Sequence, residues 1–535
     1  MATSPQRAYR AACPNCGAPV DFVSAASTSA VCSFCRSTLL RDGDALRRVG
    51  VSAELFDDHS PLQLGASGQR QGVSFTLVGR LQYGYEGGTW NEWHALFDNA
   101  ASGPRSGWLS EDNGAYVMAF DGPLPADAPP IDTLRAGQRV LADSRAWDVA
   151  SVVRARLIAA QGELPTPPRL DGEFTVVDLR NAAGEVATLD ASDPARPAWS
   201  VGRSVLIADL AMQGLKDTVS EKTLGSRGVQ CPSCGAALQV KLATTQSLSC
   251  HQCNAVVDIS QGVGADLRHY QQNNSGAGGL EPQIALGTTG TLAIGAKEGG
   301  PPLPWQVVGY MERRDIPQDS EDETTYWREY LLYNRGSGFA FLVDSNEGWS
   351  WVRPITGTPV QRQGQALWDG VAYSKKFTYP AQVTWVQGEF YWRVQRDERA
   401  MVSDFEGAGS AAARRLSQEQ TANEVTWSAG QTMNAAEVAD AFGIQPSARA
   451  ALQGDVAPLS FKGAGLRHIL VAVVVIGLLA VMLSTCGRKD CDDVRRTFGA
   501  SSTEYQQCQR SSGGGARTGG GGSFGGYSSG GGGHK

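Results

Sequence analysis

The chain contains the same cysteine motif twice, 218 residues apart. Each copy has two Cys-x-x-Cys pairs separated by fifteen residues, so the spacing is identical in both. Four thiolates at this spacing close a tetrahedral site with zinc–sulfur bonds of about 2.3 Å. We therefore predict two zinc ribbons, each holding one zinc ion; iron is the alternative metal that the spacing leaves open. The predicted ligands are Cys13, Cys16, Cys32 and Cys35 in the first copy, and Cys231, Cys234, Cys250 and Cys253 in the second.

The residues inside the first pair of each copy favour a metal knuckle over a disulfide. Proline follows the first cysteine and fixes φ, and glycine follows the second, at Gly17 and Gly235. Glycine permits the positive φ that turns backbone N–H groups toward sulfur. Because four cysteines leave no open position for water, we expect structural rather than catalytic metal sites.

Charge and cysteine usage restrict the function classes. The net charge of −7 argues against a general nucleic-acid binder. Residues 1–50 carry six Arg and three Asp, and residues 226–262 only two basic residues and one Asp. A nucleic-acid-binding ribbon is therefore the weaker alternative, and docking of protein partners or a purely structural role is favoured. Metal-binding thiols must stay reduced, which places the bulk of the chain in the cytoplasm.

The duplication extends beyond the cysteines. Several short motifs recur in order, so the chain is a tandem repeat of a ribbon followed by a domain of about 150 residues. Short β-branched and aromatic runs, such as Phe75–Val78 and Phe339–Val343, alternate with Asn- and Gly-containing turns such as Asn346-Glu347-Gly348. This pattern predicts mainly β structure with antiparallel hairpins, arranged as a barrel or as a sandwich.

One segment is apolar enough to cross a bilayer. Ile469–Thr485 contains seventeen uncharged residues, and a helix of that length rises about 25 Å. A buried core helix is the alternative, but the segment has no polar stripe. Flanking basic residues do not settle the orientation. The thiol argument leaves the ribbons inside, so we expect a single-pass inner-membrane protein whose C-terminal tail lies outside. Cys491 and Cys508 would then form a disulfide or remain unpaired.

The remaining segments complete a predicted domain map. Asn434 and Glu437 have the spacing of a helix capping box, and Gly443 is placed to end that helix. The end of the chain is a glycine-rich tail that we expect to be disordered, because 13 of its last 23 residues are glycine. The predicted bounds are 1–50 for ribbon 1, 51–215 for β domain 1, 226–262 for ribbon 2, 263–283 for a linker, 284–432 for β domain 2, 433–466 for the short helix and tether, 467–486 for the transmembrane helix and 487–535 for the tail.

Four shared motifs resemble a known family. They are a Val-Gly pair, a Trp-x-Glu-aromatic motif, a Gly-Glu pair and a late Trp-Ser-x-Gly motif. In this order they resemble the bacterial family called domain of unknown function 4178, over roughly 60% of the chain. The resemblance implies no activity, although it implies ribbon prefixes and a link to envelope stress. The motif residues are Val78-Gly79 and Val308-Gly309, Trp90/Glu92/Trp93 and Trp327/Glu329/Tyr330, Gly162-Glu163 and Gly388-Glu389, and Trp199–Gly202 and Trp427–Gly430.

Evidence for catalysis is weak. Neither β domain contains a cysteine, the second contains no histidine, and no phosphate-binding loop of the P-loop type occurs. His59 and His94 are expected to be surface or packed residues, and the shared tryptophans to be core. Carboxylates that occur in both repeats could perform acid–base chemistry, but we expect structural roles for them. They are Glu92/Glu329, Glu163/Glu389 and Asp178/Asp404.

These observations favour a membrane-anchored zinc-binding scaffold or interaction protein, with protein partners, over an enzyme. The alternatives are an enzyme that uses the shared carboxylates and a ribbon that binds nucleic acid.

Overall fold

The computed structural model describes residues 9–22, 29–42, 45–51, 60–86, 88–98, 105–112, 115–169, 172–216, 229–240, 245–259, 269–270, 282–295, 302–317, 324–334, 337–394, 398–449 and 452. Within these residues the fold is mainly β, as predicted. The predicted membrane segment 467–486 and the glycine-rich tail lie outside the described residues. No helix within the described part combines the length and the apolar character that crossing a membrane requires.

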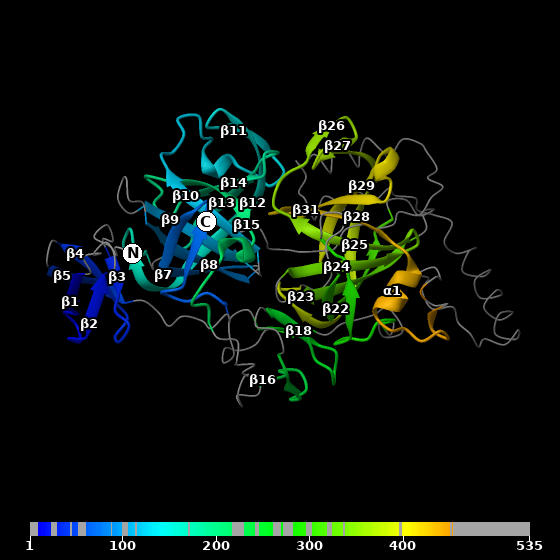
Figure 1. The fold of residues 1–535 in the computed structure, drawn as a ribbon, viewed down its shortest axis with the longest axis horizontal. Helices are drawn as coiled ribbons and strands as arrows, with labels where there is room; N and C mark the ends of the chain where they lie inside the picture. Colours follow the sequence, from blue (N-terminus) through cyan, green and yellow to red (C-terminus); the bar gives the residue numbers. More distant parts are fainter. Residues whose placement is uncertain are drawn as a thin grey trace, which may run out of the picture.

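The first repeat folds into one closed antiparallel sheet with a cysteine module, residues 9–51, at its edge (Figure 1). The ring runs β12-β13-β14-β15-β10-β9-β8-β7, and β7 pairs again with β12 to close it. We call these eight strands the first barrel. Its elements and short 3-10 helices (η) are β1 (Tyr9–Ala12), β2 (Pro19–Phe22), β3 (Ser29–Val31), β4 (Ser37–Asp42), β5 (Ala45–Val51), β6 (Ser67–Arg70), β7 (Val73–Tyr85), β8 (Gly88–Phe97), β9 (Arg105–Asp112), β10 (Ala115–Gly122), η1 (Ile131–Thr133), β11 (Arg139–Ala142), β12 (Arg145–Leu164), β13 (Phe174–Arg180), β14 (Glu185–Asp190), β15 (Ala198–Val205) and η2 (Ile207–Leu210).

The second repeat has the same topology. Its ring, the second barrel, runs β28-β29-β30-β31-β25-β24-β23-β22, and β22 pairs again with β28. A second cysteine module, residues 229–259, joins its edge. The elements are β16 (Val229–Gln230), β17 (Ala237–Leu238), β18 (Ser247–Ser249), β19 (Val256–Asp258), β20 (His269–Tyr270), β21 (Thr289–Leu292), β22 (Leu303–Asp315), β23 (Tyr326–Asn334), β24 (Gly338–Ser345), β25 (Gly348–Ile355), β26 (Val360–Arg362), β27 (Gln365–Trp368), β28 (Val371–Phe390), β29 (Arg399–Gly407), η3 (Gly409–Ala411), β30 (Arg414–Gln420), β31 (Val425–Met433) and α1 (Ala435–Ala441). Of the barrel and sandwich left open by the sequence, both repeats are closed barrels.

A single long strand makes each closure. β12 and β28 are 20 residues each. The first half of β12 pairs with β13, its second half pairs with β7, and its last three residues pair with β3 of the cysteine module. β28 pairs in the same way with β29, β22 and β18. The cysteine module is therefore hydrogen-bonded to the seam of its barrel.

The repeated Val-Gly and Gly-Glu motifs meet at this seam. Gly162 pairs with Gly79, and Gly388 pairs with Gly309. A Cβ on Gly162 would lie 2.2 Å from the carbonyl oxygen of Val78, which leaves no room for another residue. Gly162 and Gly388 also have positive φ, 72° and 85°, a conformation that glycine adopts without steric cost. The motifs thus permit the close crossing at which the strand leaves one partner for the next.

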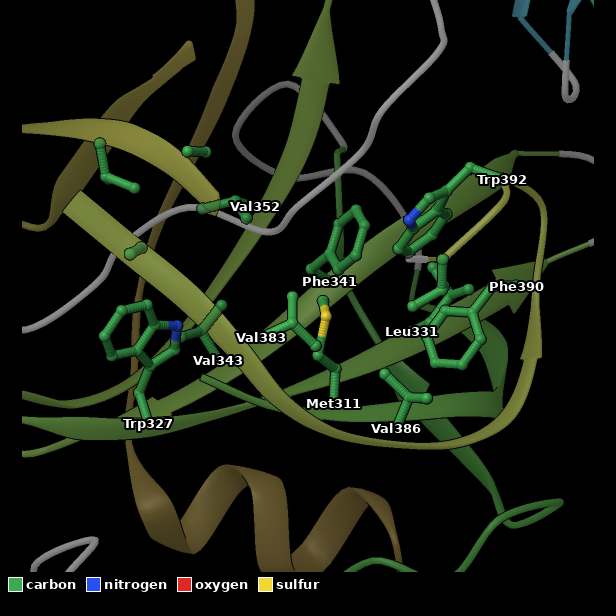
Figure 2. Close-up of a cluster of buried hydrophobic side chains, with 14 of the residues drawn as sticks. Met311, Trp327, Leu331, Phe341, Val343, Val352, Val383, Val386, Phe390 and Trp392 are labelled. Atoms are coloured by element: carbon green, nitrogen blue, oxygen red, sulfur yellow. The ribbon is translucent and has the colours of Figure 1, made fainter. Parts of the chain in front are cut away.

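Strand β23 of the second barrel is buried on both faces, and its alternate side chains enter two different cores. Trp327 and Leu331 of β23 join one core, which also contains Met311, Phe341 and Val256 of the cysteine module (Figure 2). Tyr330 and Leu332 of the same strand join another. There they pack with α1, through Val438 and with Phe442 just beyond it. Burial on both faces explains why aromatic and aliphatic residues occupy both sets of alternate positions in β23.

Helix α1 has the predicted cap. The side chain of Asn434 accepts a hydrogen bond from the Ala436 N–H, and Glu437 accepts one from the Asn434 N–H. Gly443 has φ 63°, a left-handed conformation suited to a helix end. The capping box and the C-terminal glycine are both confirmed.

Candidate metal centres

Each cysteine module presents its thiols from two tight loops. The first loop joins β1 to β2 or β16 to β17, and the second joins β3 to β4 or β18 to β19. In each loop the N–H four residues after the first cysteine donates to that cysteine's carbonyl, as Gly17 does to Cys13 over 2.8 Å. The cysteine N–H donates in turn to the carbonyl five residues on, as Cys13 does to Ala18. The same pair of bonds occurs at Cys32, Cys231 and Cys250.

The loops require positive φ at one position. It is occupied by Gly17, Arg36, Gly235 and Asn254, with φ of 75°, 57°, 76° and 57°. The positive φ expected of Gly17 and Gly235 is therefore present. Arg36 and Asn254 occupy it in the second loops, where the sequence had given no such signal. Asn tolerates this conformation better than most residues.

The sulfur positions fit a tetrahedral metal. All four sulfur atoms of each module lie within 4.8 Å of one another. The distances are 3.6 Å for Cys13–Cys35 and 3.7 Å for Cys16–Cys32, and 3.7 Å for both pairs of the second module. A tetrahedron with bonds of about 2.3 Å has edges of about 3.8 Å, whereas a disulfide needs about 2.05 Å. The donor set and the distances thus suit a metal ion such as zinc.

The protein environment separates the pKa values of the thiols. Hydrogen bonds with Ser37 and Asn15 lower the pKa of Cys35 to about 5. Burial raises the pKa of Cys253. Hydrogen bonds, among them one with the Ala255 backbone, lower it by more than burial raises it, so the pKa falls from 9.0 to about 7. At Cys16, the Ala18 backbone lowers the pKa, while the neighbouring Cys35 and burial raise it to about 12. One ligand of each module is therefore ready to bind as thiolate, and the metal must displace protons from others.

Polar contacts fasten each module to its barrel. The hydroxyl of Ser29 donates to the Leu164 carbonyl, and that of Ser247 donates to the Trp392 carbonyl over 2.8 Å. In the second module the buried Thr245 hydroxyl also donates to Glu389, over 2.6 Å. Glu389, one of the shared carboxylates, thus holds the joint between module and barrel.

The shared Trp-x-Glu motif is a hydrogen bond along one strand. Residues two apart on a strand share a face. The indole N–H of Trp327 donates to Glu329 over 2.8 Å, and that of Trp90 donates to Glu92 over 3.3 Å. All four side chains are buried, as expected for the tryptophans.

Asp178 and Asp404, the third pair of shared carboxylates, each accept a hydrogen bond from a hydroxyl group. Asp178 accepts from the hydroxyl of Thr188 over 3.0 Å, and Asp404 accepts from that of Ser417 over 2.7 Å. Each hydroxyl comes from the strand next in the ring. Both carboxylates are fully buried in the barrel wall.

The second barrel contains a buried charged cluster that the sequence did not predict. Arg313 lies 3.1 Å from Glu329 and 2.7 Å from Glu419, and all three are buried. Burial raises the pKa of Glu419 to about 7. Glu419 lies 106 residues from Arg313 in the chain, so no local pattern indicates the pair.

The histidines do not form a shared site. His94 is buried, with its ring nitrogens 2.9 Å from the Glu163 carbonyl and from the Ser106 hydroxyl. Burial lowers its pKa. The expectation of a packed residue is confirmed for His94, whereas His59 lies outside the described residues.

Comparison with known proteins gives one match. The family model described as domain of unknown function DUF4178 matches residues 63–206 and 303–435, together more than half of the chain. The two stretches correspond to the two barrels and exclude both cysteine modules. No curated protein and no solved structure matches the chain.

Proposed function

The chain belongs to the family of the domain of unknown function DUF4178, in two tandem copies, and we propose that it is a scaffold that binds protein partners and is stabilised by two structural zinc ions. The observation that carries this proposal is the closed tetrahedral geometry of four protein thiols in each module. Such a site leaves no position for a substrate or a water molecule. The shared carboxylates support a structural role, because those described accept hydrogen bonds within the barrel walls and at the module joints.

Elemental analysis of the purified full chain tests the metal. We expect two zinc ions per chain. Cys16→Ser and Cys234→Ser should each lose one ion, and Cys→Ser at both positions should lose both. A natively folded, metal-free chain, or iron in place of zinc, would contradict the proposal.

Affinity capture from solubilised membranes tests the scaffold role. The full chain should retain a defined set of proteins that the double variant with Cys16→Ser and Cys234→Ser does not retain. Recovery of the same proteins by both forms would mean that the metal-stabilised modules do not support binding.

We further propose that Ile469–Thr485 anchors the chain in the bacterial inner membrane with the cysteine modules inside, in keeping with a role in envelope stress. The apolar sequence supports this, together with the need for reduced thiols. Fractionation should find the full chain in the membrane and a chain ending at residue 466 in the soluble fraction. A membrane-impermeant thiol reagent that labels Cys16 in intact spheroplasts would reverse the proposed orientation.

A further inference from the structure

A polar cleft of about 60 Å³ lies between the two barrels. The first barrel contributes Asp148 to Ser151 and Arg180, and the second contributes Pro354 to Thr358, Gln418 and Glu424 to Trp427. A volume of this size holds a few water molecules or one small polar group, at about 10–15 Å³ for each water position. Clefts between domains are common sites for small ligands.

Backbone hydrogen bonds join the two barrels around the cleft. The Val152 N–H donates to the Asn423 carbonyl over 2.9 Å, and Ser151 faces Glu424 in an isolated antiparallel bridge. The register of β12 shifts between Val149 and Ser151, and this irregularity lies at the contact. In the opposite direction, the Thr358 N–H of the second repeat donates a hydrogen bond to the Asn181 carbonyl of the first, over 3.4 Å.

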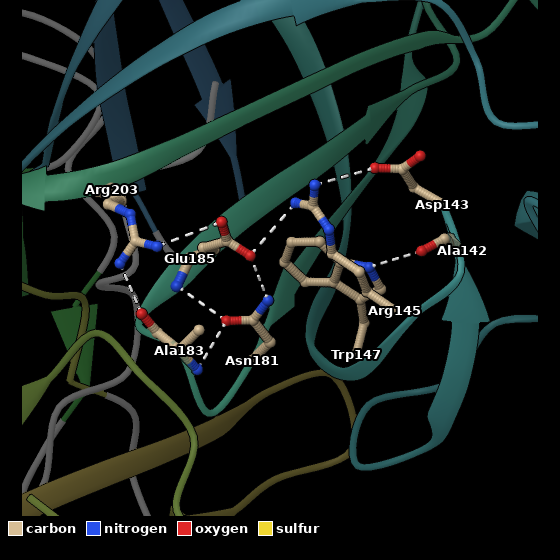
Figure 3. A network of polar contacts seen from close by, with 8 residues as sticks. All are labelled: Ala142, Asp143, Arg145, Trp147, Asn181, Ala183, Glu185 and Arg203. Atoms are coloured by element: carbon tan, nitrogen blue, oxygen red, sulfur yellow. Dashed lines mark hydrogen bonds and ion pairs between the residues drawn. The ribbon is translucent and has the colours of Figure 1, made fainter.

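The Asn181 turn is itself fixed by a polar network on the first barrel (Figure 3). Glu185 accepts from Asn181 over 2.7 Å, from Arg145 over 3.3 Å and from Arg203 over 3.2 Å. The side-chain oxygen of Asn181 accepts from the N–H groups of Ala183 and Glu185. The wall of the cleft on this side is therefore held in place before any ligand enters.

The lining favours an uncharged ligand. Arg139 donates to both carboxylate oxygens of Asp148, over 2.8 and 2.9 Å, and Arg180 lies 3.5 Å from Asp178. Asp148 and Arg180 thus each have a counter-charge within the protein, and Glu424 adds a carboxylate to the lining, which disfavours an anion. Hydroxyl and amide groups make up much of the remaining lining, at Ser151, Thr358 and Gln418 among others.

Two features of the lining indicate hydroxyl groups on the ligand. Ser151 is 5% exposed, and its hydroxyl makes no hydrogen bond within the described structure. A buried hydroxyl without a partner is unfavourable, so a ligand that donates to it or accepts from it gains affinity. Hydroxyl and amide side chains can each donate and accept, which matches a ligand whose groups do both.

We propose that this cleft binds a small neutral polyol, of the size of ethylene glycol or glycerol, and that the ligand bridges the two barrels. A charged ligand would need an unpaired counter-charge, and an apolar one would leave the hydroxyl and amide groups without partners. A polyol offers both donors and acceptors in the space available.

Calorimetric titration and thermal unfolding of the detergent-solubilised full chain test this site. The probes are ethylene glycol, 1,2-propanediol and glycerol, each up to 50 mM, with acetate and glycerol 3-phosphate as charged comparisons. At least one neutral probe should bind and raise the melting temperature. Ser151→Ala and, separately, Gln418→Ala should weaken that binding about fivefold or more, the effect of losing one hydrogen bond.

The matched control is Ser200→Ala. Ser200 is a buried serine of the first barrel whose hydroxyl also lacks a hydrogen bond, but it does not line the cleft. It should leave the affinity unchanged. Three outcomes would overturn the proposal: no neutral probe binds, a charged probe binds more tightly than every neutral one, or both cleft variants bind as the unsubstituted chain does.

Discussion

Gly388 packs against the carbonyl oxygen of Val308 so closely that a Cβ atom on Gly388 would lie 2.3 Å from it. Gly388→Ala should therefore lower the free energy of unfolding by at least about 3 kcal/mol, since a positive φ alone costs about 1–3 kcal/mol and the clash adds to it. Urea denaturation followed by tryptophan fluorescence measures the change.

Gly364 provides the control for that substitution. Its φ of 80° is close to the 85° of Gly388, but nothing lies within 4 Å of its Cβ position. Gly364→Ala should cost only about 1 kcal/mol. Equal losses at the two positions would show that conformational strain, and not the crossing, makes glycine necessary.

The carboxyl of Glu419 should make the second barrel less stable as pH rises. Its pKa is raised by burial from 4.5 to about 7. Between these values the native state holds a proton that the unfolded chain has released, so the free energy of unfolding falls as pH rises from about 4.5 to 7. Above about 7 this contribution no longer changes. Glu419→Gln should flatten the dependence in this window, as measured by urea denaturation at half-unit pH steps, and parallel curves for the two proteins would exclude Glu419 as the titrating group.

Removal of the metal should loosen the seam of each barrel. In the second repeat the Gly388 N–H donates to the Ser249 hydroxyl, and the Gln246 N–H donates to the Phe390 carbonyl. Both bonds join the barrel to a module that the proposed metal would hold together. After chelation, hydrogen exchange in peptides covering 245–249 and 388–394 should accelerate at least tenfold.

Strand β24 serves as the internal reference for that measurement, because within the described residues its hydrogen-bonded neighbours are β23 and β25 and not the module. Its exchange should change little. Uniform acceleration across the barrel would mean that metal loss unfolds the whole repeat, and no change at 388–394 would mean that the module and the seam are independent.

The capping box should set the stability of α1. Asn434→Ala removes the acceptor for the Ala436 N–H and should cost about 1 kcal/mol, whereas Asn434→Ser keeps an equivalent cap. Local hydrogen exchange in 435–442 distinguishes the two variants. Identical exchange in both would show that packing of Val438 and Phe442, and not the cap, holds the helix.

Local patterns predicted local structure well. The knuckle glycines, the capping box of α1 and the strands at Phe75–Val78 and Phe339–Val343 all follow from residues a few positions apart. The same is true of the two cysteine clusters, because each pair is fixed by one tight loop.

Structure that depends on distant pairing was not predicted. Gly388 separates two runs of strand-favouring residues, Lys376–Val386 and Glu389–Val394, yet β28 continues through Gly388 to Phe390 as one strand of 20 residues. Closure of the ring and the Arg313–Glu419 pair join segments about 70–110 residues apart. Such contacts depend on the whole fold, and no pattern among neighbouring residues of a single sequence indicates them.

The joint between each module and its barrel affects how the protein can be divided for study. A fragment that began at the linker near residue 283 would leave the final residues of β28 without their neighbour, exposing unsatisfied main-chain groups to self-association. A fragment cut upstream of Val229 would keep that edge covered. The smallest fragment to express is thus a cysteine module together with the barrel that follows it.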